Sequence, residues 1–179
     1  MSLEYIGNCS SVINWDEVIT SIENKPGVAL PRWDWDHPEF VKIKQLSVDS
    51  NYLKESAEWI NYYPNKDYDI NIDKLFGEFV GKPNYARAWI SRINPGCTAP
   101  WHWDIDDFAD EYQNKGSLVR YTARISKDGI GQVAVVNNQT IVGGNQGDVY
   151  RWGSYKDWHG SANFGYTVKY QFNYLAYEI

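Results

Sequence analysis

The sequence predicts a mainly β fold of the α+β class, a jelly roll or barrel with N-terminal helices packed on the outside of one sheet. Three observations support this prediction. From about residue 84 onward, short strand-like segments follow one another, separated by Gly, Asn and Asp turns. The chain before that point is mostly helix and loop. The aromatic content of 16%, with nine Trp and fourteen Tyr, suits the cross-strand packing of rings in sheets.

The first part of the chain, residues 1–83, is expected to be a helical and loop support region. In the segment 15–24, apolar residues recur at helical spacing, with Asn14 as the N-cap and Pro26-Gly27 after its end. The other segments expected to be helical are a short stretch from Pro38, the residues after Asp49 that carry Leu53, Ala57 and Ile60, and Ile72–Val80.

The second part, residues 84–179, is expected to be the jelly-roll core. Alternation and turn residues predict strands over Ala86–Ile93, Thr98–Ile105, Leu118–Ile125, Gln132–Val136, Gln139–Val142, Gly147–Trp152, Asp157–Ala162 and Thr167–Tyr177. Asn137-Asn138 is a two-residue loop that indicates a tight hairpin. Because no repeat, low-complexity tract or linker interrupts the chain, residues 1–179 are expected to form a single domain.

Composition excludes several classes of function. The formal net charge of -6, without a basic run, argues against nucleic-acid binding. Two cysteines, Cys9 and Cys97, do not make a disulfide framework. No basic, apolar signal segment begins the sequence, and no apolar run reaches about 18 residues, so we expect no membrane segment. These observations favour a cytoplasmic protein and leave the oligomeric state open.

The functional prediction centres on Trp101-His102-Trp103-Asp104. In an extended strand, residues i and i+2 point to the same face, so His102 and Asp104 lie side by side. An imidazole and a carboxylate supply two of the three ligands of a 2-His-1-carboxylate iron centre. His159, on another predicted strand, is the candidate for the third ligand. The motif alone is also typical of a strand histidine that is hydrogen-bonded to a nearby carboxylate, so the prediction depends on its context.

That context includes Lys169, ten residues beyond His159 in the last predicted strand. His-x-Asp, a distal His and a trailing basic residue resemble the signature of the 2-oxoglutarate/Fe(II)-dependent dioxygenases, over about residues 85–178. The features most similar to aspartyl/asparaginyl β-hydroxylase-like and prolyl-hydroxylase-like members are the Pro-Gly turn before the motif, Gly147-Asp148, Trp158-His159, Asn163 and Leu118-Val119-Arg120. Two departures are Asp104, since aspartyl β-hydroxylases commonly lack this carboxylate, and Lys169 in place of their Arg.

The resemblance implies a double-stranded β-helix, a cupin-type jelly roll, in which His102, Asp104 and His159 hold Fe(II). It also implies 2-oxoglutarate as cosubstrate, O2 as oxidant, and hydroxylation of a C–H bond in an amino-acid, peptidyl or other small-molecule substrate. Halogenating relatives have a small residue at the carboxylate position, so Asp104 favours hydroxylation. On this resemblance, Lys169 would pair with the C5 carboxylate of 2-oxoglutarate. Arg120 is the second candidate for that role, and Asn163 is a further cofactor-side candidate.

Each assignment has a structural alternative. Arg120 shares its strand face with Thr122 and Arg124, a pattern more typical of a solvated surface. Lys169 is alternatively a solvent-facing strand residue, and Asn163 alternatively satisfies a turn. His37, which precedes Pro38, is interpreted as structural.

The tryptophans are also assigned by strand parity. Trp101 and Trp103 face away from the metal, so we expect them to pack between the sheet and the N-terminal helices. Three others either line a substrate mouth or pack in the core: Trp89, Trp152 and Trp158.

Two other functions fit the same residues. One is a non-catalytic jelly-roll module that binds carbohydrate or another ligand through its many Trp and Tyr side chains, with His102, Asp104 and His159 as an incidental cluster or a structural ion site. The other is a cupin-like metalloenzyme that does not use 2-oxoglutarate. Convergence of His102, Asp104 and His159 inside the barrel would favour a metal site over the binding module. Formation of succinate would distinguish a 2-oxoglutarate-dependent oxygenase from a cupin-like metalloenzyme that does not use 2-oxoglutarate.

Overall fold

The computed structural model describes residues 3–30, 58–80, 84–102, 117–153 and 157–178. The helix predicted from Pro38 and most of the one predicted after Asp49 lie outside these residues, as do Trp103 and Asp104. The described helices are α1 (Trp15–Ile22) and α4 (Ile72–Val80). None of the helices in these ranges is long and apolar enough to cross a membrane.

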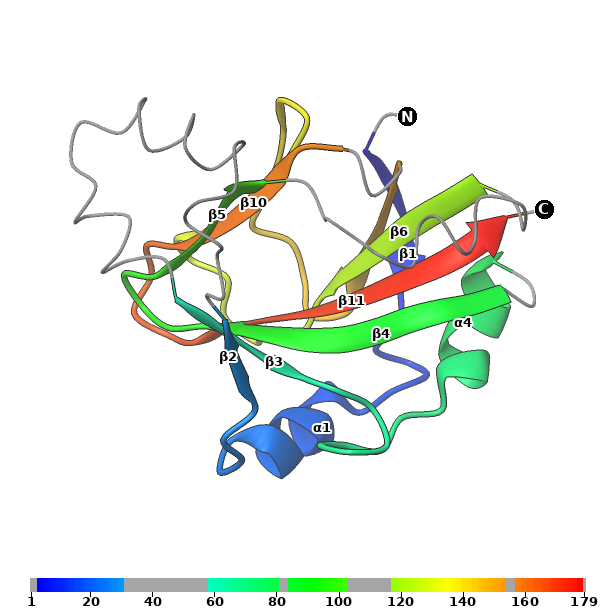
Figure 1. Cartoon of the computed structure of the whole chain (residues 1–179), viewed down its shortest axis with the longest axis horizontal. Coiled ribbons are helices and arrows are strands. Elements are labelled where there is room, and N and C mark those ends of the chain that lie inside the picture. Colours follow the sequence, from blue (N-terminus) through cyan, green and yellow to red (C-terminus); the bar gives the residue numbers. More distant parts are fainter. Residues whose placement is uncertain (1–2, 31–57, 81–83, 103–116, 154–156, 179) are drawn as a thin grey trace.

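Two antiparallel sheets make up the described part of the fold (Figure 1). The large sheet has the order β1-β9-β6-β11-β4-β3-β2 and the small sheet the order β5-β10-β7-β8. The strands of the large sheet are β1 (Glu4–Asn8), β2 (Val28–Leu30), β3 (Trp59–Tyr62), β4 (Asn84–Ile93), β6 (Ser117–Arg124), β9 (Asp148–Trp152) and β11 (Lys169–Glu178). Those of the small sheet are β5 (Thr98–His102), β7 (Gln132–Val136), β8 (Gln139–Val142) and β10 (His159–Asn163).

From β4 onward the chain passes back and forth between the sheets. β4, β6, β9 and β11 join the large sheet, while β5, β7, β8 and β10 join the small one. This order is that of a double-stranded β-helix, a jelly roll of the cupin type. The fold class predicted from the sequence is therefore confirmed, and the strands predicted from Ala86 onward correspond to β4–β11.

The hairpin between β7 and β8 follows the predicted turn chemistry. Asn137 and Asn138 have φ values of 47° and 51°, the left-handed conformation that a type I′ turn requires at both central positions. Because Asn tolerates this conformation better than most residues, the pair fixes the register in which Val136 faces Gln139.

The N-terminal part contains more sheet than predicted. α1 begins as expected, since the Asn14 side chain accepts a hydrogen bond from the Glu17 backbone N–H. The prediction of mostly helix and loop was wrong for β1, β2 and β3, which extend the large sheet at its two edges. Ile60, assigned to a helix, lies in β3 opposite Arg92 of β4. Pairing with β4 decides this short segment, because tertiary contacts override a weak local helical pattern.

The two faces of the large sheet differ in chemistry. Its outer face packs on α1, where the Trp15 ring lies 5.5 Å from that of Phe172 on β11. Val119, Tyr121 and Ala123 of β6 belong to the same apolar core. The alternating residues of β6 and β11 face the small sheet instead, so polar side chains line the interior of the barrel. The helices thus pack on one sheet, as predicted, and the polar face is enclosed by the other.

Candidate active site

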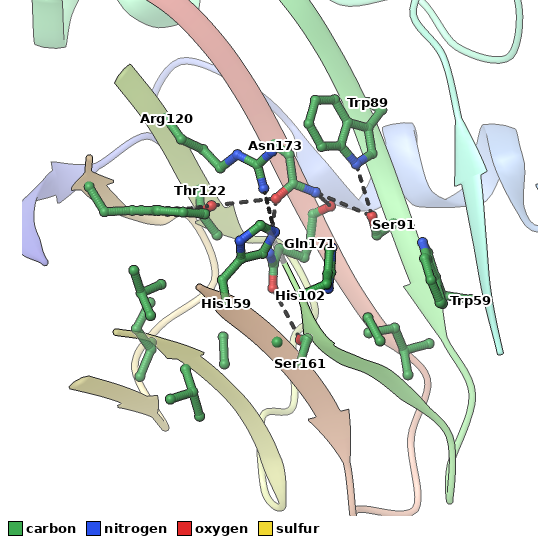
Figure 2. Close-up of a pocket in the computed structure, with 18 of the residues that line it drawn as sticks. Trp59, Trp89, Ser91, His102, Arg120, Thr122, His159, Ser161, Gln171 and Asn173 are labelled. Carbon is green, nitrogen blue, oxygen red and sulfur yellow. Dashed lines mark hydrogen bonds between the residues drawn. The ribbon is translucent and has the colours of Figure 1, made fainter. Parts of the chain in front are cut away.

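A cavity of about 130 Å³ lies between the two sheets (Figure 2). Tryptophans and polar side chains of β3, β4, β6, β9 and β11 form one wall, and the small sheet contributes His102, His159 and Ser161. The cavity is enclosed because β5 and β10 of the small sheet cover the polar faces of the large-sheet strands.

His102 and His159 are direct cross-strand partners of the antiparallel pair β5 and β10. Their ring centroids are 4.3 Å apart. Nδ1 of His102 donates to the Pro100 carbonyl oxygen at 2.5 Å, and Nδ1 of His159 donates to that of Asp157 at 2.9 Å. Because a carbonyl only accepts, these contacts place the proton on Nδ1 and leave Nε2 of each ring as the nitrogen with a lone pair.

Both imidazoles are neutral at pH 7. Desolvation by burial lowers the pKa of His102 to about 4. Burial also holds the pKa of His159 well below its usual range, and the positive charge of Arg120 lowers it further. A neutral imidazole with its Nε2 lone pair available is the form that binds a metal ion.

Arg120 reaches the same end of the cavity from β6. Its Nη1 donates to Nε2 of His159 at 2.9 Å, and its guanidinium carbon lies 5.1 Å from the Trp89 ring centroid and 4.7 Å from that of Trp152. Burial lowers the Arg120 pKa to about 9, so the side chain remains a cation at neutral pH. Arg120 is only 3% exposed, and the alternative of a solvated surface residue is therefore wrong. The polar face of β6 is covered by the small sheet.

Lys169 is buried in a second, smaller cavity of about 20 Å³. The two cavities share Thr122, Ala134, Ile141 and Gln171. Nζ of Lys169 donates to the Val133 carbonyl oxygen at 2.6 Å and to Ser161 Oγ. With an exposure of 4%, it is not the solvent-facing residue of the alternative interpretation. Burial lowers the Lys169 pKa to about 7, and the positive charge of Arg124 adds to the shift.

The Asn163 side chain hydrogen-bonds to backbone groups. Its Nδ2 donates to the carbonyl oxygens of Ile93 at 3.0 Å and Thr167 at 2.8 Å, and its Oδ1 accepts from the Gly165 N–H at 3.1 Å. It lines neither of the two cavities described above. Both ends of the amide are engaged in holding the turn between β10 and β11, which agrees with the structural alternative, and the role of Asn163 in cofactor binding stays a prediction.

A chain of hydrogen-bonded polar side chains that belongs to none of the sequence motifs crosses the cavity. Gln171 Nε2 donates to Asn173 Oδ1 at 2.9 Å, and Asn173 Nδ2 donates to Ser91 Oγ at 3.3 Å (Figure 2). Ser91 Oγ in turn donates to Asn61 Oδ1 at 2.8 Å. Strand parity places Gln171 and Asn173 on the face of Lys169, since the three residues alternate along the last strand. Asn61 carried no such signal, because β3 was not predicted.

The tryptophans divide between the inside and the outside of the barrel. Trp59, Trp89 and Trp152 line the cavity. The Trp59 ring stacks on His102 with centroids 6.2 Å apart. Trp101 faces away from the cavity, as its parity predicts, and stacks on Trp158 at 6.3 Å with 36% of its surface exposed. It does not pack against α1, which covers the large sheet, and the helices predicted from Pro38 and after Asp49 lie wholly or mostly outside the described residues.

The donor set fits Fe(II) in part. Among the described residues, no three His, Cys, Asp or Glu side chains form a metal-binding group, and Asp104 is outside the described ranges. The two neighbouring neutral imidazoles, each oriented through Nδ1 by a backbone carbonyl, are suited to two positions of a 2-His-1-carboxylate centre. The sequence predicts the third ligand at Asp104, two residues after His102.

No protein-family model matches the sequence, and no curated protein matches it significantly. Among solved structures, an oxidoreductase of the 2OG-Fe(II) oxygenase family from Burkholderia pseudomallei is similar over 92% of this chain and 91% of its own, with 14% identity and a TM-score of 0.48. The viral collagen prolyl hydroxylase of Paramecium Bursaria Chlorella virus-1 matches over 77% and 89%, with 13% identity and a TM-score of 0.48.

A protein from Acidithiobacillus ferrooxidans described as a sugar phosphate isomerase matches over 69% of this chain, with 14% identity and a TM-score of 0.40. The chain spans 62% of that protein's length. Function does not follow from similarity of fold, so it has to be argued from the site.

Proposed function

We propose that this protein is a non-haem Fe(II)- and 2-oxoglutarate-dependent oxygenase that hydroxylates a C–H bond of an amino-acid, peptidyl or other small-molecule substrate. The observation that carries this proposal is the pairing of His102 with His159 across β5 and β10, inside a double-stranded β-helix. Asp104 would complete the ligand set. Bound Fe(II) and 2-oxoglutarate would supply the oxidising chemistry, with O2 consumed and succinate and CO2 formed.

The two buried cations would have different partners. Arg120 hydrogen-bonds His159 itself and therefore lies at the metal end of the cavity. Lys169 contacts Ser161, two residues farther along β10, and lies in the adjoining cavity. A 2-oxoglutarate molecule held by the metal at its C1 and keto end needs its cation at the far end, where the C5 carboxylate lies. Lys169 is therefore the proposed partner of this carboxylate.

The remaining polar groups would position the cosubstrate. Lys169 has three N–H donors, of which Val133 O and Ser161 Oγ accept two, so one remains for a carboxylate oxygen. Gln171 lies two residues along β11 and borders both cavities, so it would lie beside the carbon chain. Lys169 is buried, which would strengthen its electrostatic contact with the carboxylate.

Anaerobic titration of the full chain with Fe(II) and 2-oxoglutarate tests the proposal. The expected result is a weak visible metal-to-ligand charge-transfer band that saturates with both components. His102→Ala and His159→Ala should abolish metal binding. His37→Ala, at a histidine that belongs to neither the proposed ligand set nor the described residues, should keep the band. A folded, iron-loaded protein without the band would contradict the use of 2-oxoglutarate and favour a cupin-like metalloenzyme of another kind.

The Arg120–His159 hydrogen bond favours a second candidate function. Because Arg120 Nη1 occupies the Nε2 atom that a metal requires, the same cavity suits a module that binds a small anionic ligand without metal. Such a module would bind its ligand equally well in a chelator and would form no succinate. Succinate formation that requires Fe(II) would rule out this alternative.

A further inference from the structure

Arg120 is a cation built into the histidine end of the cavity. It is buried on β6, whose neighbours in the sheet are β9 and β11. Its guanidinium lies near the rings of Trp152 on β9 and of Trp89 on β4, the strand beyond β11. Figure 2 shows its side chain directed toward the two histidines. Trp152 is itself fixed, because its Nε1 donates to Thr122 Oγ1 at 3.1 Å. The guanidinium is therefore held in position before any ligand arrives.

A purely structural role explains this arrangement poorly. Burying a guanidinium carries a desolvation penalty comparable to what its contacts return, and an apolar side chain of similar volume would fill the space at less cost. What a guanidinium offers is a rigid, planar set of N–H donors that matches the two oxygens of a carboxylate. Under the proposed function Lys169 would pair with the C5 carboxylate of the cosubstrate, so this carboxylate does not need Arg120.

A second arginine, Arg87, lies closer to the protein surface than the buried Arg120. Arg87 precedes Trp89 by two residues on β4 and is exposed. Its guanidinium carbon lies 5.7 Å from the Trp89 ring centroid and 5.5 Å from that of Tyr63. The Arg87 charge is also close enough to lower the pKa of Arg120, after the larger effect of burial. The Trp89 ring thus lies near both an exposed cation and a buried cation, in a chain whose formal net charge is -6. Such a local positive field attracts anions.

We propose that Arg120 binds a carboxylate of the primary substrate, and that Arg87 attracts this carboxylate toward the cavity. The substrate class is then a small carboxylic acid, such as a free amino acid, rather than a neutral or cationic molecule. The carboxylate would bind beside the histidines, so the reacting C–H bond would be one close to it. This inference rests on the proposed function of the site.

The test compares acids with their primary amides on the full-chain protein. Mn(II) and saturating 2-oxoglutarate are added first, and binding of free amino acids and simple carboxylates, each beside its primary amide, is measured by calorimetry. We expect at least one acid to bind without displacing 2-oxoglutarate, and its amide to bind roughly 30-fold more weakly or worse. The amide keeps the size and shape of the acid and removes only the charge.

Two variants and one control locate the effect. Arg120→Met should abolish the preference for acids, and Arg120→Lys should keep part of it, since a point charge replaces a planar fork. Arg151→Met is the matched control, because Arg151 on the neighbouring strand β9 pairs with Glu4 at 3.9 Å and should leave acid binding unchanged. If Arg120→Met does not fold, the comparison of acid and amide in the wild type, together with Arg120→Lys, still decides.

Three results would overturn the inference: amides that bind as well as acids, no acid that binds at all, and acids that compete with 2-oxoglutarate. The charge-transfer band is read separately in the same proteins. A missing band with an acid preference that Arg120→Met removes would contradict the proposed function while upholding the Arg120 site. A normal band without any acid preference would contradict only the Arg120 site.

Discussion

The affinity for 2-oxoglutarate should depend on pH through Lys169. Burial lowers the pKa of this side chain to about 7, so it carries its proton below that pH and loses it above. Only the ammonium form attracts the C5 carboxylate. Between pH 6 and pH 8 the protonated fraction of the free protein falls from about nine tenths to about one tenth, so the dissociation constant should rise about tenfold.

Two substitutions isolate this effect. Lys169→Met removes the cation at similar volume and should weaken 2-oxoglutarate binding roughly 30-fold or more at pH 6, the cost of losing one partner of a buried charge pair. Lys169→Arg keeps a charge that does not titrate in this range, so its dissociation constant should not change with pH. Arg151→Met again serves as the control and should reproduce the wild-type pH profile.

The assay is titration of 2-oxoglutarate into the Mn(II)-loaded protein from pH 6 to pH 9, followed by the fluorescence of the cavity tryptophans Trp89 and Trp152. A wild-type dissociation constant that stays flat over this range would refute the assignment of Lys169.

The pH dependence of protein stability offers a second check, which needs no ligand. The folded-state pKa of Lys169 lies below its usual 10.5, so the unfolded chain binds the proton more tightly. Stability should therefore rise between about pH 7 and pH 10.5, by at most about 1.4 kcal/mol per pH unit, and Lys169→Met should remove this slope.

Three further predictions concern the framework of the site. Asn163→Ala should lower the free energy of unfolding by about 1–3 kcal/mol without changing 2-oxoglutarate affinity, because the turn loses its buried partners; unchanged stability with weakened binding would support its role as a cofactor residue. Asn138→Ala should cost about 1 kcal/mol in urea denaturation, and Asn138→Gly should cost nothing, since φ at this position is 51°. Trp15→Ala should cost about 3–5 kcal/mol yet leave metal affinity intact, because its contact with Phe172 lies on the outer face of the large sheet.

The residues that face each other inside the barrel were largely predictable from the sequence. Strand periodicity placed Lys169, Gln171 and Asn173 on one face, and all three line the cavities. The turn at Asn137-Asn138 and the helix cap at Asn14 were equally predictable, because each depends on a few adjacent residues. The roles of His102 and His159 as metal ligands stay predictions.

The sequence did not indicate which face of a strand is buried or which sheet or helix covers that face. Alternation grouped Arg120 with Thr122 correctly but suggested solvent, because a polar face is usually exposed and here the small sheet encloses it. Parity also turned Trp101 away from the cavity correctly, yet no local pattern tells which sheet the helices cover. Ile60 was misassigned because the strand it belongs to is specified by Arg92 and its neighbours on β4, distant in sequence.

The central claim is that His102, Asp104 and His159 converge on one iron ion. Anomalous diffraction from crystals of the full chain, grown anaerobically with Fe(II) and 2-oxoglutarate, tests it most directly. The account predicts one iron peak bonded to Nε2 of both histidines and to a carboxylate oxygen of Asp104, with the Arg120 guanidinium withdrawn from His159. An iron peak away from this pair, or a His159 Nε2 still hydrogen-bonded to Arg120 at full iron loading, would contradict it.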